Sequence, residues 1–362
     1  MSRKYNIVIS GGGTGGHIYP AIAIANGLME EFPESQILFV GALGKMEMEK
    51  VPKSGYKIIG LPIAGINRSN MMANLSFPFK LLKSLGKANK TLRDFKPNVA
   101  IGVGGYASGP TLLMANIRGV KSVIQEQNSY AGITNKILSK WASKICVAYP
   151  NMGKFFPEER VVFTGNPVRK DIIESRVSKE EALVHFKLKK DKRTLLIIGG
   201  SQGARSINQA IEAGIEELVK AGIQVIWQTG KTFKSTKAIL EGTYISEFIY
   251  EMDFAYKAAD FVISRAGALS VSELCLTGNP SILVPFPNAA EDHQTMNALS
   301  LVEKEAAILV KDSLVNSELI KTCLKLADDV ALQQSLKKNI AGFAKPNAAK
   351  EIVEQIKQVL EK

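Results

Sequence analysis

The chain has 362 residues, 46% hydrophobic and 22% charged, a composition typical of a folded globular protein rather than a disordered one. Its longest apolar runs have the length of strands. They fall short of the roughly 18 residues of a membrane-spanning helix, and the apolar stretch near the N-terminus is too short for a signal peptide. The 46 basic against 34 acidic residues leave a net charge of +12, which favours anionic partners such as nucleic acid, acidic lipid or phosphorylated compounds.

Short β-branched runs alternate with helical patterns along the chain, in two series separated by the charged, strand-free stretch 169–193. The predicted strands are residues 5–10, 36–41, 57–61, 99–103, 121–125, 144–148 and 161–164, then 194–199, 223–228, 246–250, 260–264, 281–285 and 306–310. Strands separated by helix-length segments are typical of parallel sheets with right-handed crossovers. We therefore predict an α/β fold of two doubly wound, Rossmann-like domains that face each other across a cleft.

The first glycine-rich turn, residues 11–16, follows a predicted strand and matches the dinucleotide-binding pattern G-x-G-x-x-G. That function also needs an acidic residue about 20 positions on, at the end of the second strand. The second strand ends in Val40-Gly41-Ala42, without a carboxylate at its tip. Two more glycine loops, 103–110 and 198–206, also follow predicted strands. Such turns offer backbone N–H groups and helix N-termini to phosphates and sugar hydroxyls.

In the second series, residues 261–278 predict a strand, a turn and a helix that carries Glu273. Two interpretations of Glu273 remain open. Ser270-Val271-Ser272-Glu273 fits a helix capping box, S-x-x-E. Alternatively, the carboxylate accepts both hydroxyls of a ribose while nearby N–H groups face a diphosphate. Two of the three histidines, His17 and His293, lie in the glycine-rich or polar loops that follow strands.

Seven motifs lie along the chain between about residue 6 and about residue 300. In order they are "GGTGGHIYPAIAIA", "GVGGYASGP", "IQEQNSYAGITNK", "FTGNPVR", "GGSQGARSIN", "SRAGALSVSE" and "EDHQTMNA". Together they resemble the MurG family of UDP-N-acetylglucosamine:lipid I glycosyltransferases. Some members carry two glutamines where this chain has His293-Gln294, so the resemblance assigns no role to His293.

The resemblance implies a GT-B-type inverting enzyme of peptidoglycan synthesis. Such an enzyme moves N-acetylglucosamine from UDP-N-acetylglucosamine to the 4-hydroxyl of the MurNAc sugar of undecaprenyl-linked lipid I. We expect residues 1–166 to form an acceptor- and membrane-facing domain and 167–344 a UDP-sugar-binding domain. The C-terminal helix, 345–362, is expected to pack back on the first domain.

The same resemblance implies roles for individual residues. Thr14, Gly15 and Gly16 approach the donor sugar and its phosphates, and Asn128 and Arg169 belong to the same donor site. The backbone of Ile249 reads the uracil, and Gln294 contacts the sugar hydroxyls. The remaining implied residues line the phosphates or the ribose: Ser201, Gln202, Ala268, Leu269, Ser270, Val271, Ser272 and Glu273.

Sugar transfer with inversion needs a base for the acceptor hydroxyl and stabilisation of the departing diphosphate. His17 is the first candidate for the base because its unperturbed pKa lies near neutrality; alternatively it only hydrogen-bonds its loop. Glu126 is the second candidate. The chain has no D-x-D motif, and its three cysteines form no C-x-x-C pair. We therefore predict no metal and no cofactor.

The segment 68–96 mixes apolar side chains with lysines and predicts a helix that docks on an anionic membrane, since insertion and charge attraction act together there. Its apolar residues are Met71, Met72, Leu75, Phe77, Phe79, Leu82 and Leu85. The alternative is an ordinary packed helix with a solvated basic side. We expect a peripheral protein on the cytoplasmic face of the plasma membrane and no nucleic-acid partner. Two other functions stay open: a UDP-sugar epimerase, and an inactive nucleotide-sugar-binding subunit.

Overall fold

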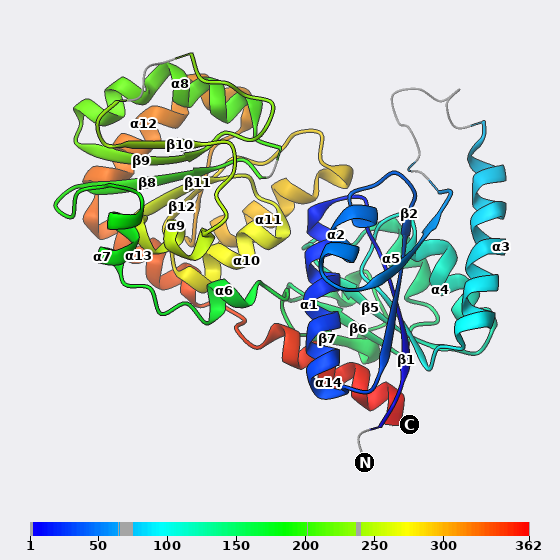
Figure 1. The fold of residues 1–362 in the computed structure, drawn as a ribbon. Coiled ribbons are helices and arrows are strands. Elements are labelled where there is room, and N and C mark those ends of the chain that lie inside the picture. The colour runs from blue at the N-terminus through cyan, green and yellow to red at the C-terminus, as the bar shows by residue number, and fades with distance from the viewer. Residues whose placement is uncertain (1–2, 64, 66–74, 201, 237–239, 362) are drawn as a thin grey trace. The chain divides into compact units, whose positions relative to one another are not determined.

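The computed structural model describes residues 3–63, 65, 75–200, 202–236 and 240–361. Three residues named above, Met71, Met72 and Ser201, lie outside these ranges. The chain divides into two compact units, Met1–Val168 with Asn347–Lys362 and Arg169–Pro346 (Figure 1). Each unit holds one parallel sheet and is described by itself.

The first unit contains a seven-stranded sheet in the order β3-β2-β1-β4-β5-β6-β7. Every neighbouring pair is parallel. The strands are β1 (Asn6–Ser10), β2 (Gln36–Ala42), β3 (Lys57–Leu61), β4 (Val99–Gly102), β5 (Lys121–Glu126), β6 (Lys144–Val147) and β7 (Val161–Phe163). This order places the reversal of the winding direction between β1 and β4, the point at which doubly wound sheets bind ligands.

Helices cover both faces of this sheet because successive side chains of a strand point to opposite faces. On β1, Ile7 and Ile9 join one buried cluster and Val8 joins another. The first cluster lies under α1 (Gly15–Glu31) and α14 (Ala348–Glu361), which pack side by side as the blue and red helices (Figure 1). The second lies under α3 (Phe77–Phe95), α4 (Ser108–Ile117) and α5 (Ile133–Leu138). The smaller helical elements are α2 (Glu47–Lys53), η2 (Met152–Lys154) and η3 (Glu158–Arg160).

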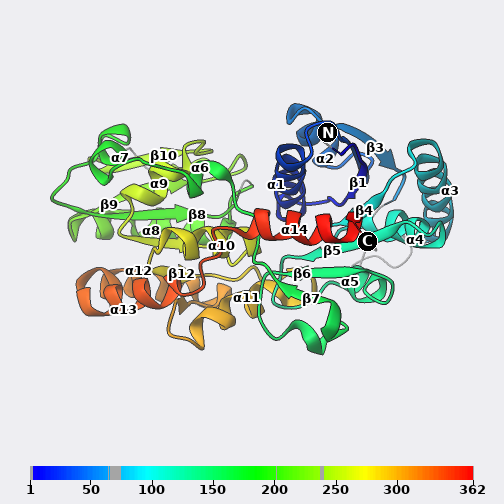
Figure 2. The ribbon, with the colours of Figure 1, turned by 90° about the horizontal axis from the view of Figure 1, so that it is seen from below.

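The second unit contains a six-stranded sheet in the order β10-β9-β8-β11-β12-β13, again parallel (Figure 2). Its strands are β8 (Arg193–Ile198), β9 (Ile223–Gln228), β10 (Thr243–Ser246), β11 (Phe261–Ser264), β12 (Ser281–Leu283) and β13 (Ile308–Leu309). Its helices are α6 (Lys170–Ile173), α7 (Lys179–His185), α8 (Arg205–Lys220), α9 (Met252–Ala258), α10 (Ala268–Thr277), α11 (His293–Val302), α12 (Val315–Asp328) and α13 (Val330–Ala341), with 3₁₀ turns η4 (Ala290–Asp292) and η5 (Asp312–Leu314). The reversal point of this sheet lies between β8 and β11.

The predicted fold class of two doubly wound parallel sheets is confirmed. The strands predicted at 57–61 and 223–228 have these bounds in the structure. The strand predicted at 246–250 is wrong, since β10 runs from Thr243 to Ser246. The register explains the shift. Ser246 pairs with Gln228, the last residue of β9. The N–H of Gly230 still donates to the carbonyl oxygen of Glu247, but Gly230 lies beyond the end of β9, so the strand pairing ends at Ser246.

Candidate functional site

The glycine loop after β1 is held by Glu47, a residue that the sequence analysis missed. Glu47 begins α2, its side chain is 1% exposed, and its two oxygens accept hydrogen bonds of 2.9 Å from the N–H groups of Gly13 and Ala42. A carboxylate therefore does stand at the tip of β2, contrary to the expectation from Val40-Gly41-Ala42. It comes from the following helix and is already engaged by backbone donors, so this loop differs from a ribose-binding dinucleotide turn.

The second glycine loop, after β4, packs directly on the first. Gly105 has φ +82°, and a Cβ atom there would lie 2.2 Å from the carbonyl oxygen of Gly12. His17, in the first turn of α1, lies over Gly104, where a Cβ would come within 2.9 Å of its ring. The two loops thus bring His17 to the reversal point between β1 and β4. Thr14 precedes α1 as its N-cap and is exposed, with no capping bond from its hydroxyl.

His17 is oriented by Gln127, another residue that sequence reasoning passed over. The Nδ1 atom of His17 lies 3.0 Å from Oε1 of Gln127. The Nε2 group of Gln127 donates to the carbonyl oxygen of Val103 at 2.8 Å, and Gln127 is 1% exposed. A signal was present in the sequence: Gln127 lies inside the "EQN" motif, between Glu126 and Asn128.

Glu126, the second candidate base, sits at the end of β5 and is 2% exposed. Its Oε1 accepts from the backbone N–H of Asn128 at 3.1 Å and from the Asn128 amide at 3.3 Å. Its Oε2 accepts from the Gly132 N–H at 3.0 Å and from the Asn135 amide at 2.9 Å. These four hydrogen bonds use the acceptor capacity of the carboxylate to order the loop before α5. The geometry favours His17 over Glu126 as the base.

Glu273 lies in the second turn of α10 and does not cap it. The N-cap of α10 is Gly267, without a side-chain hydrogen bond, so the proposed capping box on Ser270 is wrong. A capping box does form at the start of α7, where it joins Ser178 to Glu181. Ser270 misses this role because the helix begins two residues before it.

The Glu273 carboxylate instead bridges two other elements. Its Oε2 accepts a 2.8 Å hydrogen bond from the hydroxyl of Tyr256 on α9. Its Oε1 lies 3.4 Å from Nε of Arg169, which precedes α6. Burial raises the pKa of the Glu273 carboxyl above its usual value, although the Arg169 guanidinium opposes this. The structure thus brings together Arg169 and Glu273, which come from motifs about a hundred residues apart in the sequence.

The other residues that are predicted to bind the donor nucleotide sugar follow the carboxyl ends of the second unit's strands or lie on the helices after them. Gln202 is exposed in the loop after β8, and Ala268, Leu269, Ser270, Val271 and Ser272 form the first turns of α10. The N–H of Ile249 donates to Oε1 of Gln228 at 3.0 Å. Gln294, on α11, accepts from the N–H of Phe286 at 2.9 Å. These hydrogen bonds fix the positions of Ile249 and Gln294. A ligand that used the same groups would have to share or replace these hydrogen bonds.

Arg265 links several loops at the carboxyl ends of the second sheet's strands. It is 9% exposed, and its NH1 contacts the carbonyl oxygen of Val284 at 3.1 Å and Oδ1 of Asp312 at 2.6 Å. Its NH2 donates to the hydroxyl of Ser206 on α8 at 2.9 Å. One buried guanidinium therefore connects the loops that follow β11, β12 and β13 with the start of α8. Five donors in a rigid fork suit this role.

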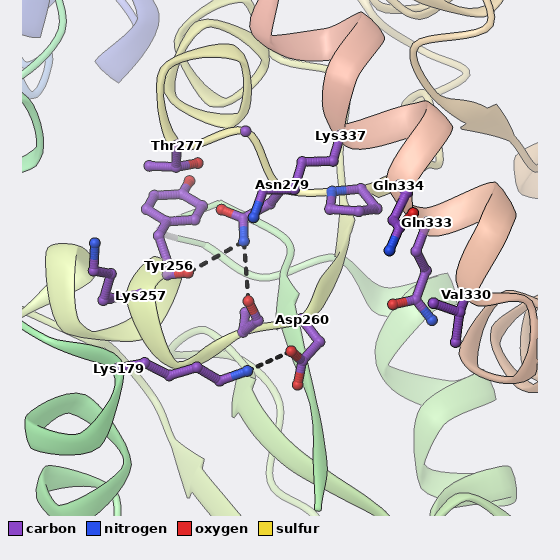
Figure 3. A pocket seen from close by; sticks show the side chains of 13 residues that line it. Lys179, Tyr256, Lys257, Asp260, Thr277, Asn279, Val330, Gln333, Gln334 and Lys337 are labelled. Atoms are coloured by element: carbon purple, nitrogen blue, oxygen red, sulfur yellow. Dashed lines mark hydrogen bonds and ion pairs between the residues drawn. The ribbon is translucent and has the colours of Figure 1, made fainter. Parts of the chain in front are cut away.

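A cavity of about 440 Å³ lies at the opposite edge of the second sheet (Figure 3). It is lined by the residues that precede β11 and β12 and by the start of α13. Within it, Lys179 pairs with Asp260, while Asn279 donates to the carbonyl oxygens of Tyr256 and Ala259. This cavity lies at the amino ends of the strands, whereas the predicted donor residues follow the carboxyl ends. It therefore differs from the predicted donor site, although Tyr256 both lines the cavity and donates to Glu273.

The described residues bear on two parts of the predicted chemistry. In those ranges, no group of three or more His, Cys, Asp or Glu side chains is placed to hold a metal ion. No helix within the same ranges is long and apolar enough to cross a membrane.

Comparisons with known proteins match the whole chain. The model of the glycosyltransferase family 28 N-terminal domain matches residues 7–147, and that of the C-terminal domain matches residues 194–355. A protein of Parabacteroides distasonis named UDP-N-acetylglucosamine–N-acetylmuramyl-(pentapeptide) pyrophosphoryl-undecaprenol N-acetylglucosamine transferase is 53% identical over 366 residues, covering 99% of this chain and 100% of its own.

Solved structures agree with this match. The crystal structure of Acinetobacter baumannii MurG superposes with a TM-score of 0.79 at 28% identity, covering 98% of this chain and 99% of that one. The UDP-GlcNAc 2-epimerase from Neisseria meningitidis has a TM-score of 0.68 at 15% identity, covering 98% and 100%. The second likeness is one of fold alone.

Proposed function

The chain belongs to glycosyltransferase family 28 and, within it, to the MurG enzymes, and we propose that it transfers N-acetylglucosamine with inversion, using His17 as the base. It is a hexosyltransferase of the GT-B fold, with UDP-N-acetylglucosamine as donor and lipid I as acceptor, and serves peptidoglycan synthesis. The observation that carries this conclusion is the 53% identity over the full length of an enzyme named for the reaction.

The second unit is proposed to bind the donor. The first turn of α10 presents backbone N–H groups at the carboxyl end of β11, where a diphosphate can accept them. Glu273 already accepts from Tyr256 and lies beside Arg169, and its oxygens retain acceptor capacity for ribose hydroxyls. Gln202 would line the phosphates together with Ser201, which lies outside the described residues. Ile249 would contact the uracil and Gln294 the sugar. Leaving-group stabilisation by these N–H groups requires no metal.

The first unit is proposed to bind the acceptor and to supply the base. The oxygen of the MurNAc 4-hydroxyl attacks C1 of the donor sugar from the face opposite the diphosphate. As the new C1–O bond forms, the bond from C1 to UDP breaks, and the hydroxyl proton passes to Nε2 of His17. One displacement of this kind converts an α-linked donor into a β-linked product. Thr14, Gly15 and Gly16, in the same loop as His17, complete the proposed set.

A membrane-docking surface on α3 is proposed for the lipid-linked acceptor. Phe79 and Leu82 on α3, and Leu75 just before it, are 74%, 66% and 74% exposed. The same helix carries exposed lysines at positions 80, 83, 87 and 90. Phe77 and Leu85 do not belong to this surface. Both are half-buried, and Phe77 packs against the core of the first unit. Peripheral attachment at the cytoplasmic face of the plasma membrane would follow from such a surface.

A direct assay tests the proposed reaction. Purified protein receives labelled UDP-N-acetylglucosamine with or without a short-chain lipid I analogue, and the linkage of the product is determined. We expect label to move only when the acceptor is present and to form a β-linkage to the 4-hydroxyl. An α-linked product would refute inversion. Conversion of the free nucleotide sugar without acceptor would instead indicate an epimerase, whose likeness to this chain is restricted to the fold.

A further inference from the structure

The hydrogen bonds around Gln127 determine which ring nitrogen of His17 carries the proton. The carbonyl oxygen of Val103 can only accept, so the group of Gln127 that lies 2.8 Å from it must be the Nε2 amide. The other end of the side chain, Oε1, then faces Nδ1 of His17 at 3.0 Å. An amide oxygen can only accept, so Nδ1 of His17 is the donor. In the neutral ring, the lone pair is left on Nε2.

Gln127 cannot turn over easily to reverse this assignment. Its side chain is 1% exposed, and its backbone carbonyl accepts a 3.0 Å hydrogen bond from the Asn166 amide. A flipped amide would set its oxygen against the Val103 carbonyl oxygen, a repulsive contact in a buried site. The Nδ1–Cε1 edge of the His17 ring also lies against Gly104, where a Cβ would come within 2.9 Å of the ring.

We propose that Gln127 is the positioning residue that keeps His17 in its Nδ1–H tautomer, so that Nε2 is the basic nitrogen. This rests on the proposed function in one respect, the role of His17 as base. Gln127 acts as the orienting group of a hydrogen-bonded pair, as carboxylates do in other enzymes. Unlike a carboxylate, a neutral amide fixes the tautomer without adding a negative charge that would stabilise the imidazolium.

The test reads the tautomer directly by long-range ¹H–¹⁵N NMR of the imidazole rings. The chain has only three histidines, so the His17 signals are identified by their loss in His17→Gln. We expect the Nδ1–H form of His17 in the wild type and a mixture of tautomers in Gln127→Met. His293 is an internal control: its Nδ1 lies 2.6 Å from the carbonyl oxygen of Ala290, so it should keep the Nδ1–H form in both proteins.

Kinetics supply the second readout. Gln127→Met should lower kcat at unchanged donor KM in proportion to the Nδ1–H fraction that the NMR experiment measures, because only rings with the correct tautomer are competent. Gln127→Glu should shift the acidic limb of the pH–rate profile upward by about one unit or more, because a carboxylate stabilises the imidazolium. Gln224→Met removes a glutamine that is equally buried, in the second unit, and controls for the general cost of such a change.

The possible failures are distinguishable. A wild-type His17 ring protonated at Nε2, or an unchanged tautomer in Gln127→Met, would overturn the positioning role. An unshifted pH–rate profile in Gln127→Glu, with His17→Gln inactive, would also count against it. If His17→Gln retained full activity, His17 would not be the base of the proposed function. The tautomer that NMR assigns to His17 would be unaffected by that result.

Discussion

The carboxylate of Glu47 accepts a hydrogen bond of 2.9 Å from the backbone N–H of Gly13. The pair joins the start of α2 to the glycine loop that precedes His17. The loop has the shape to fit this carboxylate: Gly12 has φ +144°, and a Cβ there would lie 2.2 Å from Oε1 of Glu47. An acidic side chain of the protein itself therefore accepts the hydrogen bond from one of the N–H groups that a glycine loop usually offers to a bound anion.

Replacing Glu47 by Ala should destabilise the first unit. The buried N–H of Ala42 would lose its acceptor at a cost of about 1–3 kcal/mol, and the part-buried N–H of Gly13 would lose its acceptor at a smaller cost because water can reach it. We expect the free energy of unfolding, measured with urea, to fall by about 1–4 kcal/mol. Glu49→Ala is the control on the same helix, because the side chain of Glu49 is 62% exposed and its pair with Lys53 contributes little. Equal stability of the two variants would contradict the role given to Glu47.

Replacing Glu273 by Ala should weaken donor binding while the fold survives. A hydrogen-bonded carboxylate contributes on the order of 1.5–3 kcal/mol, so the donor KM should rise about 10- to 100-fold. Glu181→Ala, which breaks the capping box of α7, should lower the melting temperature and leave donor kinetics unchanged. If Glu273→Ala behaves like Glu181→Ala, then Glu273 only links Tyr256 and Arg169.

The raised pKa of Glu273 predicts a pH-dependent stability difference. Because burial raises this pKa in the folded protein, the folded state binds the proton more tightly than the unfolded one. The stabilising contribution of the protonated group is complete below pH 4.5 and is lost as pH rises through the folded pKa. Glu273→Gln should therefore gain stability relative to the wild type as pH rises from about 4 through this range. Urea denaturation at several pH values measures the difference, and a constant or falling difference would refute the prediction.

Activity should persist in excess chelator. The motivation is the absence of a D-x-D motif in the sequence and the N–H groups at the start of α10, which can stabilise the departing diphosphate. Initial rates with and without EDTA, after prior dialysis against chelator, are the measurement. Loss of turnover with rescue by Mg²⁺ or Mn²⁺ would reject metal-free stabilisation of the leaving group.

Membrane docking through α3 should depend on salt and on two apolar side chains. Lys80, Lys83 and Lys87 changed together to Glu should release the protein from anionic vesicles, because each basic residue contributes about 1 kcal/mol. Phe79→Ser with Leu82→Ser should weaken binding even at low salt. The control variant makes the same change in charge on α12 and α13, with Lys321, Lys325 and Lys338 replaced by Glu. Vesicle co-sedimentation compares them, and equal binding by the two triple variants would leave α3 an ordinary surface helix.

The sequence alone determined the two sheets and the positions of the seven motifs. Alternation of β-branched runs with helix-length segments is a local pattern, and the glycine loops follow strands because tight turns need glycine there. The seven motifs identified the family because they occur along the chain in the family's order. These features depend on residues that are close in sequence, so they can be predicted without knowing how distant segments meet.

Tertiary structure decided the partners of the key side chains. Glu47 with Gly13, Gln127 with His17, and Arg169 with Glu273 are pairs 34, 110 and 104 residues apart, and no local pattern encodes them. The capping box forms at Ser178 and not at Ser270 because the start of α10 is set by where β11 ends. Phe77 is half-buried and Phe79 exposed because the sheet lies on one side of α3 only. Burial and hydrogen bonding are properties of the assembled unit, so these details follow only once the strands and helices have packed.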